Sequence, residues 1–336
     1  MNQPSSQPAV KSSVPADVQL YLLGFDVDEP AVQQLQAVLC ELILECGGEM
    51  DLRLLDGITV GANYDDALYS VDLGYASSVA KTYTNANGLL GVAKTLRVKR
   101  NGAVRAHVVF SNVLGPLLER DDEMFGPICN LVAHELAHVA LIGWFDTHSP
   151  GVTLEPYKGD WATGQMQDTA HIIWEEYAAC RLCAHFATDA VQSQLAQSVE
   201  LALGTELRDA NDAIKRYRKH ADTATLFMEV GGHISRPLRS LAYLLGHLDG
   251  AQRNLNLVSL CPTFANSRFS PYVSILHEAL RQAWESRLSW NGMHGVDRVV
   301  DVLLQAMRDA GVDVQLSEGL PGTRLDVPFT SETTFT

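Results

Sequence analysis

The chain has 336 residues, of which 46% are hydrophobic and 19% charged, so it can bury a large core and global disorder is excluded. Its formal net charge of -15 argues against nonspecific binding to nucleic acid or anionic lipid, because both need clustered lysine and arginine. The N-terminus lacks the apolar stretch of a secretory signal, and no later stretch reaches about 18 uninterrupted apolar residues. We therefore expect a cytoplasmic protein without nucleic-acid or membrane partners.

The first part of the chain mixes helix and strand patterns. Apolar residues spaced by three and four predict a helix over residues 31–46, which begins after a proline and ends at Gly47. The stretches "DLRLLDGITVG" (51–61) and "AVRAHVVFSNVL" (103–114) are typical of strands, and "NYDDALYSVDLG" (63–74) is typical of a short helix. This pattern predicts a small strand-containing N-terminal lobe.

Helical spacing dominates from residue 122 onward. The predicted helical segments are 127–144, 168–188, 190–219, 235–248, 271–288 and 295–310. Strands followed by helices predict the α+β class, with an extended helical C-terminal region. We expect a disordered tail over 1–16, a core over 17–189, a helical region over 190–316 and an irregular C-terminal tail over 317–336.

The stretch "NLVAHELAHVALIGW" (130–144) carries the most specific chemical signal. Residues four apart share one face of a helix, so the imidazoles of His134 and His138 can bind one metal ion. Glu135 is turned about 100° from His134, where it can reach a metal-bound water but not ligate comfortably. Such a triplet is expected by chance only about 0.02 times in a chain with this histidine and glutamate content.

The alternative is that these three residues are ordinary polar side chains on a well-packed helix. Two imidazoles and a carboxylate in an apolar segment would then each need a buried partner, whereas a shared metal ion supplies one to all of them. We therefore prefer the metal site.

This stretch resembles the zincin metallopeptidases, whose signature is His-Glu-x-x-His on a helix. The metzincin branch would need glycine and histidine where this chain has Leu141 and Trp144, so it is excluded. The gluzincin branch takes a third ligand from a glutamate on a later helix. The stretch "HIIWEEYAACRLCAHFA" (171–187) is similar to that helix and offers Glu176, with Glu175 as the alternative third ligand.

The resemblance covers about residues 104–188 and implies a zincin-like core, a zinc ion and hydrolysis of peptide bonds with Glu135 as general base. Among gluzincins, the small bacterial ImmA/IrrE-like group is a plausible neighbour. The chain departs from the family pattern at Cys180, where an aspartate or asparagine often supports a zinc histidine. Candidates for an oxyanion-stabilising residue are His233, Tyr243 and His247, each with a purely structural role as the alternative.

Three further points stay open at this level. In zincins, the strand before the active-site helix lies along the cleft, so 103–114 either pairs with a peptide substrate or is an ordinary strand of the sheet. Cys180 and Cys183 form a CxxC that we interpret as helix packing, in line with six sparse, reduced cysteines.

The main functional alternative is a non-catalytic or regulatory zincin-fold protein that binds a protein partner through its C-terminal helices. A further alternative is a helical structural protein in which the motif occurs by chance.

Overall fold

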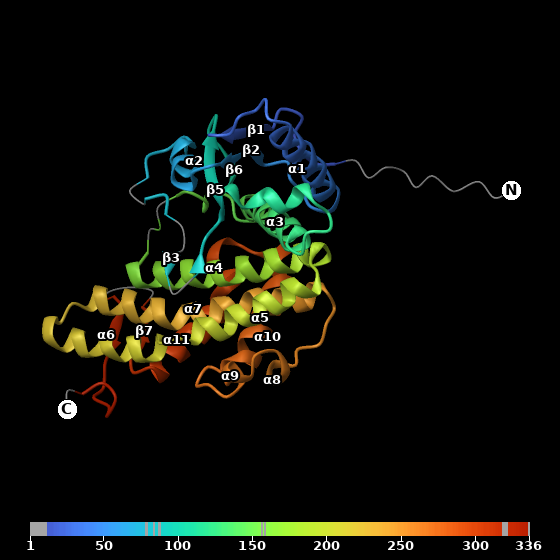
Figure 1. The fold of residues 1–336 in the computed structure, drawn as a ribbon. Coiled ribbons are helices and arrows are strands. Elements are labelled where there is room, and N and C mark those ends of the chain that lie inside the picture. The colour runs from blue at the N-terminus through green and yellow to red at the C-terminus, as the bar shows by residue number, and fades with distance from the viewer. Residues whose placement is uncertain are drawn as a thin grey trace. The chain divides into compact units, whose positions relative to one another are not determined.

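Helices form most of the described part of the chain, which also contains one four-stranded sheet and two two-stranded sheets, so the fold class is α+β (Figure 1). The structure is a computed structural model, and it describes residues 12–77, 80–82, 85–86, 89–155, 157, 159–317 and 322–334. The chain divides into two compact units. Unit 1 comprises Met1–Asn85 with Leu90–Trp144, and unit 2 comprises Ala86–Leu89 with Phe145–Thr336. The core expected over 17–189 therefore takes in unit 1 together with the first helix of unit 2.

Unit 1 contains a four-stranded sheet in the order β1-β2-β6-β5. Strands β1 (Gln19–Leu23), β2 (Leu55–Gly61) and β6 (Ala103–Phe110) are parallel, and β5 (Ala93–Arg100) pairs antiparallel with β6. Because β6 lies between β2 and β5, both of its edges are occupied. The strand expected to lie along a substrate cleft is therefore an interior strand, and β5 is the edge strand next to it.

The helices of unit 1 cover the two faces of this sheet. Their bounds are α1 Pro30–Glu49, α2 Tyr64–Ser70, the 3-10 helix η1 Asn112–Leu118 and α3 Phe125–His148. Ala67 and Leu68 of α2 form an apolar cluster with Leu96, Val98 and Val109 of the sheet. Thr95 points to the opposite face, because neighbouring residues of a strand alternate, and there it bonds to α3.

Helix α1 runs through Gly47, which was expected to end it, and continues to Glu49. A Cβ at Gly47 would lie 2.3 Å from Ser12 Oγ and 2.6 Å from Val14 Cγ2, so the glycine is required by close packing against the incoming chain. Ser13 donates from its hydroxyl to the carbonyls of Gly47 and Met50, at 2.8 and 2.7 Å. The predicted N-terminal tail thus includes residues 12–16 that are held to α1, whereas residues 1–11 lie outside the described residues.

Helix α3 also continues past its expected end. Gly143 lies inside the helix, and a Cβ there would be 3.2 Å from Leu54 Cδ1, so Gly143 serves packing rather than termination. Within the described residues, α3 is the one helix long and apolar enough to cross a membrane by length and composition. The buried core helix of a soluble protein passes the same test. In α3, 56% of the most apolar window is buried. The expected cytoplasmic location stays a prediction.

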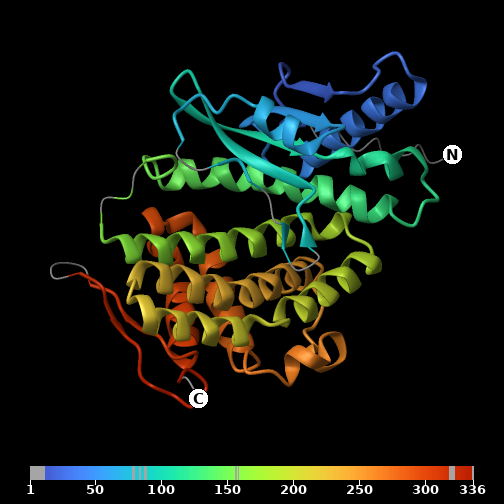
Figure 2. The same ribbon diagram turned by 60° about the vertical axis from the view of Figure 1, so that its left-hand side comes forward.

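Unit 2 is built around the long helix α7 (Thr223–Gly250). The helices around it are α4 Trp161–Cys183, α5 Asp189–Leu203, α6 Glu206–His220, α10 Tyr272–Ser286 and α11 Asp297–Asp309, with the short helices α8 Leu257–Leu260 and α9 Pro262–Ala265 (Figure 2). α7 contacts α4, α5, α6, α10 and α11. Its sequence was expected to be helical only over 235–248, whereas the helix begins at Thr223 and runs through Gly231 and Gly232. The segment 190–219 is broken at Gly204, whose positive φ separates α5 from α6.

The closest helix packing in unit 2 is between α7 and α4. A Cβ at Gly246 would lie 2.1 Å from the carbonyl oxygen of Tyr177, and one at Gly250 would lie 2.3 Å from that of Arg181. These two glycines allow α7 to approach the backbone of α4 directly. The position of α4 is therefore fixed at Tyr177, one residue after the expected ligand Glu176.

The C-terminal segment lies against unit 2 through a few specific contacts. Strand β8 (Arg324–Asp326) pairs antiparallel with β7 (Asp313–Gln315). Arg218 of α6 donates to the carbonyl oxygens of Val327, Pro328 and Thr333. The predicted irregular tail over 317–336 thus contains a short strand and residues with defined partners.

Candidate metal centre

Helix α3 brings the two histidines of the motif together. The Nε2 atoms of His134 and His138 are 3.2 Å apart, and the two rings are perpendicular with centroids 4.8 Å apart. A tetrahedral zinc ion bound at 2.0 to 2.1 Å requires its nitrogen ligands to be about 3.3 Å apart. The spacing of these two atoms therefore fits two vertices of such a site.

Glu135 lies beside the pair and is held from the sheet. Its side chain is buried, and its Oε2 accepts a hydrogen bond of 2.7 Å from the Thr95 hydroxyl of β5. The same hydroxyl is 2.9 Å from the carbonyl oxygen of Glu135. Burial lowers the pKa of the adjacent Lys94, and the negative charge of Glu135 opposes that shift. Thr95 thus fixes one carboxylate oxygen of Glu135 and leaves the other for chemistry.

Thr95 is a residue that the sequence analysis missed. The stretch "AKTLRVKR" alternates apolar Leu96 and Val98 with polar side chains, a period of two that is typical of a half-buried strand. That alternation was the available signal, and it would have placed Thr95 on the face opposite the apolar cluster.

Two adjacent carboxylates of α4, Glu176 and Glu175, belong to unit 2, whereas the two histidines belong to unit 1. Glu176 accepts a hydrogen bond from Tyr243 of its own unit. Glu175, the alternative, is buried and faces His171, with its Oε2 3.7 Å from His171 Nδ1. One step along the helix separates these two environments, because adjacent residues are turned by about 100°.

Tyr243 of α7 is bonded to Glu176. Burial raises the pKa of the Tyr243 hydroxyl well above its usual value, and the negative charge of Glu176, to which it donates a hydrogen bond, raises it further. The phenol therefore stays protonated, and its hydrogen bond orients the Glu176 carboxylate. This role differs from the oxyanion-stabilising role considered for it from the sequence.

The other residues considered from the sequence have separate surroundings. His233 Nδ1 is 2.6 Å from Oε2 of Glu206, and His247 is buried in α7. His107 of β6 bonds to Thr59 Oγ1 at 2.9 Å and to Asp56 at 3.2 Å, and burial lowers its pKa. These contacts give His233 and His107 structural partners.

The cysteines are all free thiols, and Cys180 and Cys183 of the CxxC are both buried. The hydrogen bond with Cys183 and burial raise the pKa of Cys180 well above its usual value. Cys180 is therefore a neutral thiol, and both side chains are packed in α4. Position 180 accordingly provides no charged support to a metal ligand.

Comparison with family models, with curated proteins and with solved structures gave no match. The case for the site therefore depends on its own geometry.

Proposed function

We propose that this chain is a zinc-dependent metallopeptidase with a zincin-like core of the gluzincin type. His134, His138 and Glu176 are the proposed ligands and Glu135 is the proposed general base. The observation that carries the proposal is the 3.2 Å separation of the two histidine Nε2 atoms, because it fits two adjacent zinc ligands. Two imidazoles and one carboxylate also form a donor set that suits zinc.

The roles of the chain's own residues follow from their contacts. Zinc, when bound by three protein ligands, supplies an acidified water and polarises a carbonyl group. Glu135 would accept a proton from a water molecule and would pass it to the leaving amine. Thr95 keeps the Glu135 carboxylate in one orientation during both transfers, through its 2.7 Å hydrogen bond. Tyr243 orients the Glu176 carboxylate through its hydrogen bond.

Strand β5 supports a peptide as the substrate. It is one of the two edge strands of the sheet, and it carries Thr95 next to the proposed base. An extended peptide can add to such an edge through main-chain hydrogen bonds. The proposed substrate is therefore a peptide or a protein segment in an extended conformation.

Metal analysis with matched variants tests this proposal. We expect about one zinc ion per chain in the wild type and in Glu135→Gln, because Glu135 is not a ligand. His138→Gln and Glu176→Gln should each weaken zinc binding by at least tenfold, whereas Glu175→Gln and the exposed His185→Gln should not. A folded wild type that binds no zinc would refute the proposal, and equal zinc affinity of the Glu176 and Glu175 variants would remove the third ligand.

Proteolysis separates the enzyme from the second candidate, a regulatory protein that keeps the metal site. The second candidate is favoured by the extent of the chain beyond α4, which folds into its own set of helices. The zinc-loaded wild type should cleave an unfolded protein such as reduced casein, and Glu135→Gln should lose at least a thousandfold in rate while retaining zinc. Zinc binding without any cleavage that depends on Glu135 would favour the regulatory protein.

A further inference from the structure

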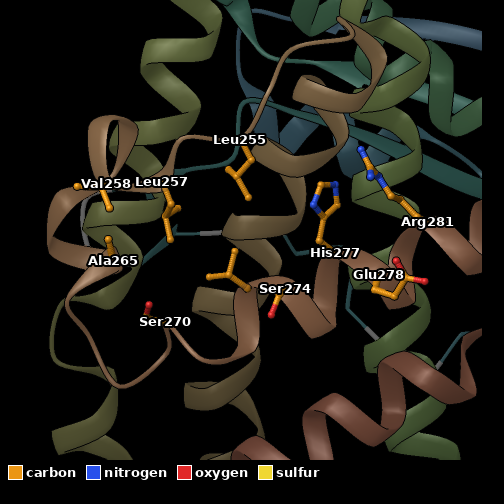
Figure 3. Close-up of a pocket in the computed structure, with 10 residues that line it drawn as sticks. Leu255, Leu257, Val258, Ala265, Ser270, Ser274, His277, Glu278 and Arg281 are labelled. Carbon is orange, nitrogen blue, oxygen red and sulfur yellow. The ribbon is translucent and has the colours of Figure 1, made fainter.

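Unit 2 contains a pocket of about 400 Å³ between α10 and the segment that carries α8 and α9 (Figure 3). This volume is in the range of sites that bind small molecules. Its apolar lining residues are Leu255, Leu257, Val258, Ala265 and Val273. Its polar lining residues are Ser270, Ser274, His277, Glu278 and Arg281. The pocket contains none of the residues proposed to bind zinc.

The two kinds of side chain lie at different ends of the pocket. Figure 3 shows Leu257 and Val258 at one end and His277, Glu278 and Arg281 at the other. The α10 residues that line it recur every three or four positions, so they form one face of that helix. A ligand that fills this pocket meets an apolar wall and a charged end.

A buried carboxylate lies behind the charged end. Asp249, near the C-terminal end of α7, has a side chain only 3% exposed. It accepts hydrogen bonds from Tyr177 at 2.6 Å and from Arg281 Nε at 2.9 Å, and it lies 3.0 Å from His277 Nε2. Arg181 Nη1 is 3.5 Å away. Burial alone would raise the pKa of Asp249, but the hydrogen bonds from His277, Arg281 and Tyr177 outweigh it and lower the pKa.

Two guanidinium groups, those of Arg181 and Arg281, face the Asp249 carboxylate. Arg281 uses Nε and Nη2 to bind Asp249, so its Nη1 remains for a ligand. Glu278 and Arg281 are both exposed at the rim of the pocket, so water screens both charges, and Glu278 balances the second guanidinium group. Asp249 thus acts as an anchor that holds Arg281 at the end of the pocket.

We propose that this pocket binds a small carboxylate whose other end is apolar. The carboxylate accepts a hydrogen bond from Arg281 Nη1, and the apolar group lies against Leu257 and Val258. A small inorganic anion would leave the apolar wall in water, and a purely apolar ligand would make no hydrogen bond with Arg281 Nη1. Both a free short-chain acid and the C-terminal residue of a peptide have this chemistry.

Calorimetric titration with simple probes tests the proposal. Hexanoate has both features, acetate has only the charge and hexan-1-ol has only the chain. We expect hexanoate to bind at least tenfold more tightly than acetate or hexanol. N-acetyl-leucine, compared with hexanoate, separates the two sources: tighter binding of N-acetyl-leucine indicates a peptide C-terminus and tighter binding of hexanoate a free acid. Equal affinity for hexanoate, acetate and hexanol would overturn the proposal.

Two variants locate the binding, and each has a control. Arg281→Gln should weaken hexanoate binding at least tenfold, whereas the exposed Arg298→Gln should not. Because Arg281 also anchors Asp249, Ser274→Trp is the second variant: Ser274 is exposed, and the indole fills the pocket without disturbing the core. Its control is Ser193→Trp on an exposed face of α5. Unchanged hexanoate binding by a folded Ser274→Trp protein would show that the acid binds elsewhere and would refute the proposal.

Discussion

At the residue scale, the hydrogen bond between Thr95 and Glu135 links the sheet to the proposed base. A bond from a hydroxyl to a carboxylate is worth about 1.5 to 3 kcal/mol. Its effect on the reaction is a matter of orientation, because a carboxylate that rotates freely spends less time facing the water it must deprotonate. Thr95 is therefore a positioning residue, and it can be changed without altering a metal ligand.

We expect Thr95→Val to lower kcat by about tenfold with little change in zinc content, since it removes the hydroxyl and keeps the shape of the side chain. Thr95→Ser should restore most of the rate. Steady-state kinetics on a protein substrate, together with zinc analysis of each variant, provide the measurement. A kcat for Thr95→Val equal to that of the wild type would exclude the positioning role.

At the element scale, the glycines of α7 decide how closely it packs against α4. Gly246 and Gly250 face the backbone of α4, whereas Gly232 of the same helix has no neighbour within 4 Å of its would-be Cβ. Replacing glycine by alanine is therefore expected to destabilise the protein at Gly246 and to stabilise it at Gly232. Glu176 precedes the contact residue Tyr177, so a displacement of α4 would also move the proposed ligand.

Gly246→Ala should destabilise the protein by about 3 kcal/mol, because the methyl group would overlap the Tyr177 carbonyl and the helices must separate. Gly232→Ala is the control and should stabilise it by roughly 0.5 to 1 kcal/mol, since alanine loses less backbone entropy in a helix. Urea denaturation of the two variants measures both effects. Similar stabilities for the two variants would contradict the close approach of α7 and α4.

Several elements could be predicted from sequence because their signals are local. The helix of the metal motif, α1, α2 and the strands β2 and β6 all follow from periodicity. The predictions that were wrong concern helix ends that depend on tertiary contacts. Gly47 and Gly143 stay inside helices because another chain segment packs against each of them, and this packing leaves no pattern in the sequence.

The residues of the candidate site also fall into two groups: those related by local sequence spacing and those related only by the fold. His134, Glu135 and His138 share one helix, so their spacing is sufficient to relate them. Glu176 was suggested by resemblance, and its distinction from Glu175 needed the direction in which each side chain points. Thr95 and Tyr243 lie far from the motif in sequence, on β5 and α7, and contact the site residues only in the folded chain.

At the scale of the whole molecule, Asp249 ties three helices of unit 2 together. Its partners Tyr177 and Arg181 belong to α4, and His277 and Arg281 belong to α10. The pKa of Asp249 is lowered on folding, so its ionised form stabilises the folded state. This contribution is fully present above the unfolded-state pKa of about 3.9 and is lost as the pH falls through the folded-state pKa.

We expect Asp249→Asn to lower the free energy of unfolding at pH 7 by about 2 kcal/mol, because it removes charged hydrogen bonds from a buried position. The difference from wild type should shrink as the pH falls below about 4, since the wild-type carboxyl group then becomes protonated. Urea denaturation at several pH values measures this, with the exposed Asp301→Asn as control. A difference that is independent of pH would mean that Asp249 acts through shape rather than charge.

The contacts of Arg218 bear on how the end of the chain can vary. Arg218 binds main-chain oxygens of the C-terminal segment, and its guanidinium lies 3.8 Å from the centre of the Phe329 ring. Carbonyl oxygens are the same in every residue, so most positions of this segment are free to change identity while the segment stays in place. Insertions and deletions are not tolerated equally, because they shift all the acceptors at once. The segment therefore constrains length more than it constrains sequence.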